Sequence, residues 1–336
     1  MEGARKSIAI AMNAAADEII FTSGGTESDN AAIKGVAWGR NGKGHLLTTP
    51  IEHHAVLEPM HSLADLGFEI EILPVGTDGL VDPADVKRML RPDTILVSVM
   101  HANNEIGSIQ PISSIGAICR EAGVLFHTDA VQSFGKLAID VKAMNIDLLS
   151  LSAHKLYGPK GTGALYIRRG IQLRRFQEGG EQERGRRGGT LNVPGIVGLG
   201  KAVSLSIAGM EAEAARQSDL RDRFLALLMK RISGIHVTGS RVYRMPNNCH
   251  ICVEGVEGEP LLLSLDMAGI CASAGSACST GSTLASGVLL AIGLPEELAK
   301  GAIRFTLGRA TTWDMLSHTV DVLEMAVNGL RSLSTR

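Results

Sequence analysis

Short apolar runs alternate with helix-like stretches through the first two hundred residues of the chain. Seven of these runs have the length and composition of strands: 18–22, 46–49, 68–75, 95–100, 124–128, 148–152 and 164–167. Amphipathic stretches that predict helices separate most of them, for example 29–38, 56–66, 83–90 and 112–122. Because the runs are apolar almost throughout, we expect strands that are buried on both faces. The pattern therefore predicts an α/β fold, with a mostly parallel central sheet and helices on both faces.

The pattern changes after Gly195. A long helical stretch, two strand-like runs and a last helix follow, at 197–232, 250–256, 270–274 and 313–330. A length of 336 residues also suits more than one hydrophobic core. We therefore predict a large domain over residues 1–210 and a smaller α+β domain over residues 211–336.

Polar clusters follow five of the predicted strands. They are 23–26, 52–54, 101–107, 129–132 and 152–155. The carboxyl ends of parallel strands lie at one edge of a sheet, and ligands bind there in open α/β folds. Packing alone gives no reason for five polar clusters at these positions. The sequence therefore predicts a ligand site at this edge of the sheet.

Charge and cysteine content limit the partners and the compartment. The 33 basic and 35 acidic residues leave a net charge of −2, which does not predict binding to nucleic acid or to a charged membrane surface. No run of about eighteen apolar residues predicts a transmembrane helix. The five cysteines form no paired CxxC blocks, so we expect free thiols in a reducing compartment, the cytoplasm. The single CxxC, Cys249 to Cys252, favours two residues entering a strand over a redox or metal site.

Two of the polar clusters suit charged groups of a ligand. Ser23-Gly24-Gly25-Thr26 ends a strand and opens a helix, where backbone N–H groups bind phosphate, and a plain strand–helix turn is equally consistent. Asp129 and Gln132 follow another buried strand. A buried carboxylate needs a cationic partner such as a protonated pyridine nitrogen, although an ordinary helix N-cap also explains Asp129.

Lys155 is the candidate nucleophile of this edge. It ends the cluster Ser152-Ala153-His154-Lys155, and burial there would lower the pKa of its amine and suit it to Schiff-base chemistry. Ser152 and His154 can hold phosphate, and a surface lysine is the alternative interpretation. His53 could stack on a flat ring or be a structural histidine, and Asn104 offers a side-chain amide.

Two residues of the second domain also carry candidate chemistry. Cys278 lies in Gly275-Ser276-Ala277-Cys278-Ser279-Thr280, and such small neighbours favour an exposed, reactive thiol over a buried structural one. Arg304 lies among apolar residues in Ile303-Arg304-Phe305. A buried arginine needs an anion, and a substrate carboxylate matches its planar fork of donors.

Together these motifs resemble those of a known family. The matching segments, in the family's order, are 21–30, 52–53, 103–107, 129–132, 152–161, 188–190, 275–278 and 303–305. The sequence resembles the class V aminotransferase group of fold-type I pyridoxal-phosphate (PLP) transferases. Within that group it is similar to cysteine desulfurases of the NifS/IscS type, and the resemblance covers nearly the whole chain.

The resemblance implies how the cofactor, pyridoxal 5′-phosphate, is bound. Lys155 would hold it covalently, and Asp129 would pair with its pyridine nitrogen. His53 would stack on its ring as part of the catalytic machinery, and Gln132 would bond the ring hydroxyl. The phosphate would be held by four residues: Gly25 through its amide, Thr26, Ser152 and His154. Thr190 would reach the phosphate bound by a partner subunit, which implies a homodimer.

The implied reaction converts L-cysteine to L-alanine. Asn104 and Arg304 would bind the substrate carboxylate, and Asn104 would also contact the cofactor. Cys278 would take the sulfur as a persulfide and pass it to a sulfur-acceptor protein or an iron–sulfur scaffold protein. It would also be a transient ligand of an iron–sulfur cluster.

Two alternatives stay open. The first is a selenocysteine lyase or another class V PLP enzyme. The second is a non-catalytic subunit, because family members begin with an additional segment and this chain starts inside the first expected helix. Retention of Lys155, Cys278, Asp129 and His53 favours the desulfurase, because a non-catalytic subunit needs none of them.

Overall fold

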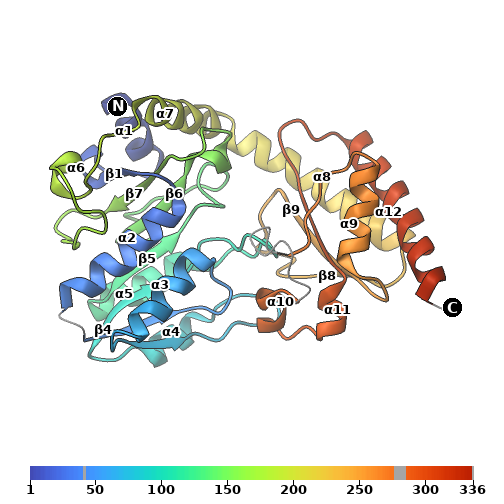
Figure 1. Ribbon diagram of the computed structural model, residues 1–336, viewed down its shortest axis with the longest axis horizontal. Coiled ribbons are helices and arrows are strands. Elements are labelled where there is room, and N and C mark those ends of the chain that lie inside the picture. Colours follow the sequence, from blue (N-terminus) through green and yellow to red (C-terminus); the bar gives the residue numbers. More distant parts are fainter. Residues whose placement is uncertain (41–42, 276–284, 335–336) are drawn as a thin grey trace. The chain divides into compact units, whose positions relative to one another are not determined.

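The computed structural model describes residues 1–40, 43–275 and 285–334 (Figure 1). These residues form two compact units. The large unit comprises Met1–Pro74, Val81–Ala102 and Gln110–Met210, and the small unit comprises Val75–Leu80, Asn103–Ile109 and Glu211–Arg336. Two short segments from the first half of the chain therefore belong to the small unit.

A seven-stranded sheet runs through the described part of the large unit. Its strands are β1 (Ile19–Thr22), β2 (His45–Thr48), β3 (Glu69–Ile72), β4 (Thr94–Ser98), β5 (Leu125–Asp129), β6 (Leu148–Ser152) and β7 (Gly163–Ile167). Their order is β1-β7-β6-β5-β4-β2-β3, and β7 runs antiparallel to both of its neighbours while the other pairs are parallel. Each predicted strand is present, with ends shifted by a few residues. The predicted α/β fold with a mostly parallel sheet is confirmed.

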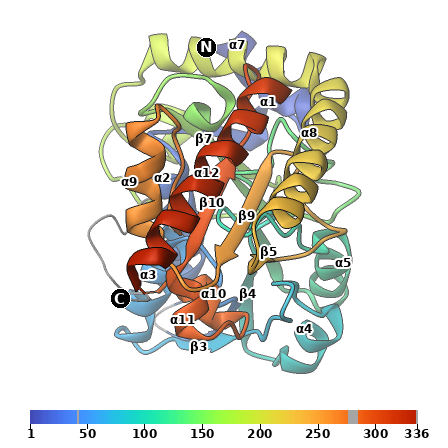
Figure 2. The same ribbon diagram turned by 90° about the vertical axis from the view of Figure 1, so that its right-hand side faces the viewer.

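Helices cover both faces of this sheet. They are α1 (Glu2–Ala11), α2 (Gly25–Ala37), α3 (His54–Ala64), α4 (Pro83–Met89), α5 (Ile112–Ala122), α6 (Gln182–Gly185) and α7 (Val193–Ala208), with 3-10 turns at Ala16–Glu18, Trp38–Arg40 and Ala153–Leu156. Buried residues of α2 and α3, such as Ile33 and Met60, form one core with Leu46, Leu96 and Leu148 of the strands. Helix α5 lies on the opposite face of the sheet (Figure 2). This apolar cover leaves the strand ends as the polar edge of the large unit.

The described part of the small unit contains a three-stranded antiparallel sheet with helices packed on it. The strands, in the order β10-β9-β8, are β8 (Ile235–Val237), β9 (Asn248–Val253) and β10 (Ala302–Thr306). The helices are α8 (Met210–Arg231), α9 (Gly258–Met267), α10 (Gly287–Ala291), α11 (Glu296–Lys300) and α12 (Trp313–Ser334). Helices α8, α9 and α12 lie over the strands of this sheet (Figure 2). Phe224, Leu261 and Leu323 from these helices share one core with Ile251 and Ile303 of the sheet. The small unit therefore has a hydrophobic core of its own.

The predicted long helix over 197–232 is wrong. Helix α7 ends at Ala208 and α8 begins at Met210, so the predicted helix is interrupted at the residue between them. That residue is Gly209, and a glycine inside a helix costs roughly 1 kcal/mol relative to alanine, so the break falls there. No single helix of the described residues is long and apolar enough to cross a bilayer; α7 and α8 meet that criterion only as a bent pair.

The predicted strand over 270–274 is also wrong. Only Ser273 pairs with β10, through its N–H to the carbonyl oxygen of Arg304 at 3.1 Å. Gly269 and Gly275 on either side have φ of 76° and 55°, in the left-handed region. The extended stretch between them is therefore too short for a strand.

Candidate active site

The N-terminus of α2 forms a glycine-lined cradle just after β1. A side chain at Gly25 would place its Cβ 2.6 Å from Cγ2 of Val131, and one at Gly24 would lie 3.9 Å from Oγ of Ser152. Thr26 is exposed in the first turn of the helix. The structure thus brings together three of the predicted clusters: 23–26, 129–132 and 152–155. The first N–H groups of a helix have no intrahelical acceptor, so this cradle suits a phosphate.

Ser152, His154 and Lys155 lie at the end of β6 and on the 3-10 turn that follows it. The Oγ atom of Ser152 is 2.8 Å from Nδ1 of His154. Burial lowers the pKa of His154, and the charges of Lys155 and Lys160 lower it further. A neutral imidazole keeps one N–H donor, so the turn offers phosphate donors and a primary amine within four residues of chain.

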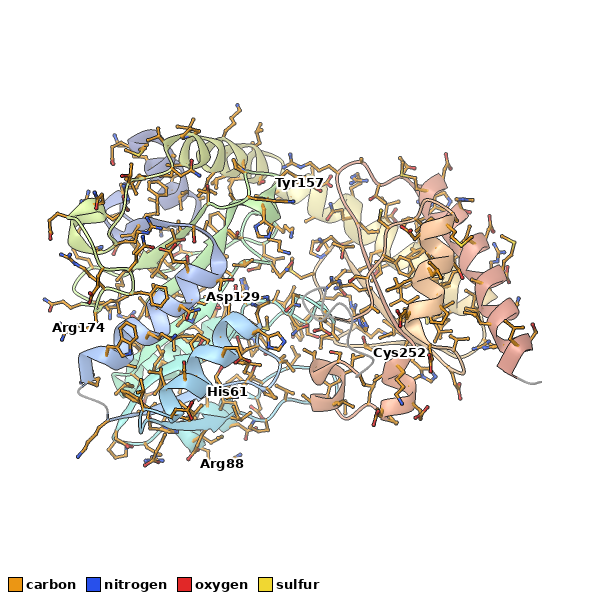
Figure 3. All side chains as sticks on the ribbon, in the orientation of Figure 1. His61, Arg88, Asp129, Tyr157, Arg174 and Cys252 are labelled. Carbon is orange, nitrogen blue, oxygen red and sulfur yellow. The ribbon has the colours of Figure 1, made fainter. Side chains whose placement is uncertain are left out.

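Asp129 is the last residue of β5 and is labelled in Figure 3. It is 6% exposed, and its Oδ1 accepts a hydrogen bond from the N–H of Val131 at 2.8 Å. Burial raises the pKa of Asp129 to about 6, although the Val131 amide and the charge of Lys155 oppose this effect. A carboxylate that is buried at a cost is stabilised by a cation. A protonated pyridine nitrogen is such a cation, so the residues present fit a pyridoxal ring.

His53 precedes α3 as its N-cap. Its Nδ1 accepts a hydrogen bond from the N–H of Ala55 at 3.0 Å, which places the ring proton on Nε2 and fixes the ring's orientation. Burial lowers the pKa of His53, and the nearby charges of His54 and Lys155 add to the effect. His53 is therefore a neutral, oriented ring, as stacking on a flat cofactor requires.

Gln132 and Thr190 are less strongly defined by their surroundings. The backbone carbonyl of Gln132 accepts a hydrogen bond from Nζ of Lys136 at 3.0 Å, and burial lowers the pKa of Lys136 to about 8. Thr190 is exposed between α6 and α7, next to Gly189, whose N–H donates to Oε1 of Gln182 at 3.0 Å. Their contacts with a cofactor stay predictions.

In the small unit, Arg304 and Asn104 lie together. Nη1 of Arg304, on β10, donates to the backbone carbonyl of Asn104 at 2.7 Å. This contact uses the carbonyl of Asn104 and not the side-chain amide that the sequence suggested. Oδ1 of Asn103 accepts from the N–H groups of Glu105 and Ile106 at 2.8 and 2.9 Å, which folds the segment into a tight turn. The turn therefore orients the Arg304 guanidinium.

Several buried titratable side chains of the large unit received no role in the sequence prediction. Among them are Asp29, Glu52, His101 and His127, each at most 4% exposed. Glu52 and His101 belong to predicted polar clusters, and Asp29 to a segment that matches the family. His127 carried a different signal, because it lies two residues before Asp129 on one strand and so points to the same face. Cys278 lies outside the described residues, together with residues 276, 277 and 279–284.

The chain is similar to known proteins over nearly its whole length. The aminotransferase class-V family model matches residues 1–317. Cysteine desulfurase IscS from Dictyoglomus turgidum is 54% identical over 335 residues, which cover 99% of this chain and 85% of that protein. Cysteine desulfurase IscS from Methanosarcina thermophila is 50% identical over 332 residues, covering 98% and 82%.

The chain is also similar to solved structures over most of its length. A NifS-like protein has a TM-score of 0.91 at 36% identity and covers 97% of this chain and 87% of its own. The structure described as SspA in complex with cysteine has a TM-score of 0.80 at 40% identity and covers 91% and 86%.

The sheet in which β7 alone opposes its neighbours, and the polar cradle at the strand ends, are those of a fold-type I pyridoxal-phosphate enzyme. The chain belongs to the aminotransferase class-V family. The predicted family, fold type and cofactor are therefore confirmed.

Proposed function

We propose that this chain is a cysteine desulfurase, a PLP enzyme that converts L-cysteine to L-alanine and keeps the sulfur as a persulfide. Relatives that carry this name match nearly the whole chain at about half identity, and one similar structure contains cysteine. The observation that carries the proposal is the meeting of the Gly25 cradle, Ser152 and the buried Asp129 region at one edge of the sheet.

The cofactor roles rest on the large unit. We assign covalent attachment to Lys155, the ring nitrogen to Asp129, the ring face to His53 and the ring hydroxyl to Gln132. The phosphate is assigned to four groups: the Gly25 amide, Thr26, Ser152 and His154. When bound, PLP supplies an electron sink, and the protein supplies orientation and charge. Two findings support these assignments. His53 is neutral, and Asp129 is buried where its carboxylate needs a cationic partner.

The substrate roles rest on the small unit. Arg304 is assigned to the cysteine carboxylate, because its guanidinium is half-buried and already oriented by the Asn104 carbonyl. Asn104 is assigned to the same substrate group and to the cofactor. Cys278, as a thiolate, attacks the substrate sulfur; the S–S bond forms as the C–S bond breaks, and the carbon takes up a proton. Cysteine and a thiol thus give alanine and a persulfide, with no external oxidant or reductant.

The remaining proposals concern the partners and the cellular compartment. We propose a homodimer in which the exposed Thr190 reaches the phosphate bound by the partner subunit. The persulfide of Cys278 then passes to a sulfur-acceptor or iron–sulfur scaffold protein, and Cys278 is assigned as a transient cluster ligand. The cytoplasm suits such a thiol, and the cysteines in the described part of the chain are free: Cys119, Cys249, Cys252 and Cys271.

The test is to incubate the chain with PLP and L-cysteine and to measure alanine and sulfide. Cys278→Ser and Lys155→Ala should abolish alanine formation, whereas Cys271→Ser should not, because Cys271 is an exposed cysteine with no assigned role. Faster turnover of L-selenocysteine would favour the lyase alternative. A chain that binds PLP but makes no alanine would refute the proposal.

A further inference from the structure

A row of buried polar side chains crosses three neighbouring strands of the large sheet. Ser98 on β4, His127 on β5 and Ser150 on β6 are each 0% exposed. Nδ1 of His127 lies 2.8 Å from Oγ of Ser98, and Nε2 lies 3.1 Å from Oγ of Ser150. A neutral imidazole donates from one ring nitrogen and accepts at the other, and a hydroxyl can do either. Both nitrogens of His127 are thus satisfied within the row.

Asp29 adds a carboxyl group to this row from α2, which packs on the same strands (Figure 1). It is 1% exposed, and its Oδ1 lies 3.5 Å from Nε2 of His127. Ser150, whose hydroxyl also meets Nε2 of His127, is the register partner of Asp129, so the two carboxyl groups lie near the same residue of β6.

Charging both carboxyl groups at once would cost much free energy, because both are buried and two negative charges repel each other. Burial and the charge of Asp129 raise the pKa of Asp29 well above its ordinary value. Asp129 has an N–H donor from Val131 and the charge of Lys155 to favour its ionised form. Burial lowers the pKa of His127 to about 3, so His127 supplies no compensating positive charge.

Glu52 is the remaining acid that faces Asp29. Its Oε1 accepts hydrogen bonds from Oγ1 of Thr49 at 2.8 Å and from the N–H of Met100 at 2.9 Å. Burial raises the pKa of Glu52 to about 8, so this acid is also mostly neutral at neutral pH. The titratable groups around Asp29 are thus His127 and Asp129 from β5 and Glu52 from the segment before α3.

We propose that Asp29 is a positioning residue: it stays a neutral carboxylic acid within the Ser150–His127–Ser98 row and so confines the negative charge of this layer to Asp129. The inference rests on the proposed role of Asp129 as the partner of the cofactor's ring nitrogen. A single fixed anion at Asp129 keeps that nitrogen protonated. A charged Asp29 would instead repel the Asp129 carboxylate and so favour a proton on Asp129 over one on the ring nitrogen, which would weaken the electron sink.

Infrared difference spectra of the apoprotein at neutral pH test the protonation state directly. Wild type minus Asp29→Asn should contain the C=O stretch of a protonated carboxyl group. Wild type minus Asp129→Asn should contain carboxylate bands instead. Glu52→Gln serves as the control, because it removes a different neutral acid and should leave the Asp29 band in place. Loss of a carboxylate band on Asp29→Asn would overturn the proposal.

Cofactor affinity gives a second, independent readout. Asp29→Asn keeps shape and neutrality, so we expect the Kd for PLP to change by no more than about threefold. Asp129→Asn removes the anion and should weaken PLP binding by about tenfold or more. Equal losses in the two variants would contradict the inference. Should Asp29→Asn misfold, Ser150→Ala must shift the frequency of the neutral-acid band, and an unshifted band would refute the inference.

Neither measurement uses cysteine turnover. A protein that makes no alanine, yet has the neutral Asp29 band and the unequal PLP affinities, would refute the proposed desulfurase and keep this inference. An active desulfurase with a charged Asp29 would refute this inference and keep the proposed desulfurase function.

Discussion

A buried ion pair between α1 and α6 allows a specific prediction about the free energy of unfolding. Nη1 and Nη2 of Arg5 each lie 2.8 Å from a carboxylate oxygen of Glu183, and Nη1 also donates to the carbonyl of Ile19. The side chains are 9% and 1% exposed. Arg5→Met would leave Glu183 buried with the N–H of Phe21 as a remaining donor. Removing one partner of a buried pair costs about 3–5 kcal/mol of unfolding free energy, and we expect a loss in that range.

A surface ion pair provides the matched control. Nη2 of Arg169 lies 2.9 Å from a carboxylate oxygen of Asp17, but these side chains are 71% and 41% exposed. Solvent screens such a pair, so Arg169→Met should cost at most about 1 kcal/mol. The double variant Arg5→Met/Glu183→Gln removes the orphaned charge and should recover much of the loss.

The assay is urea unfolding of the holoenzyme at a fixed excess of PLP, followed by cofactor absorbance as a probe of the large unit. A fixed excess of ligand adds the same stabilisation to every variant with unchanged affinity, so PLP affinity is measured for each one. The reasoning is refuted if Arg5→Met loses no more stability than Arg169→Met. It is also refuted if the double variant is no more stable than Arg5→Met.

Three further predictions concern the site. Gly25→Ala should weaken PLP binding because its Cβ would lie 2.6 Å from Val131, whereas Gly3→Ala, with nothing within 4 Å, should not; fluorescence titration with PLP checks both. Arg304→Gln should raise the KM for L-cysteine about tenfold to a hundredfold with unchanged PLP affinity, since a hydrogen bond to a charged group is worth roughly 1.5–3 kcal/mol; a smaller rise would argue against carboxylate binding. PLP affinity of the apoprotein should fall as pH drops below about 6, because Asp129 then takes up a proton, and Asp129→Asn should flatten that dependence. The raised pKa of Asp129 also favours the folded apoprotein at low pH, so its contribution to stability is lost as pH rises from about 4 to about 6 in urea titrations.

The strands and the cradle could be predicted because their signals are local. The apolar runs are short and bounded by polar residues, and the cluster 23–26 directly follows a strand. The helix break at Gly209 was missed because a glycine within a helical pattern does not by itself decide between a tolerated defect and a bend. The strand predicted over 270–274 was wrong, because the glycines on either side limit the extended segment to a length that apolar content does not indicate.

The Asp29 network lay beyond sequence reasoning for a different reason. Its members are far apart in the chain, and Asp29 joins His127 only because α2 packs across β5 and β6. Spacing predicts which face of one strand a residue occupies, as for His127 and Asp129, but not which helix covers that face. The role of Asn104 was similarly hidden, because the contact uses a backbone carbonyl that every residue possesses.

The interleaving of the two units governs the order in which the chain can fold as it is synthesised. The six chain segments alternate between the units, so the chain passes from one unit to the other five times. The carbonyl of Glu105 accepts a hydrogen bond from Nδ2 of Asn248, 143 residues later in the sequence. At a synthesis rate of about 5–20 residues per second, Glu105 waits on the order of 7–30 s for this partner to be made. A gene fragment that encodes residues 211–336 alone would lack Asn103–Ile109, so the small unit is a unit in space and cannot be excised as one continuous piece of chain.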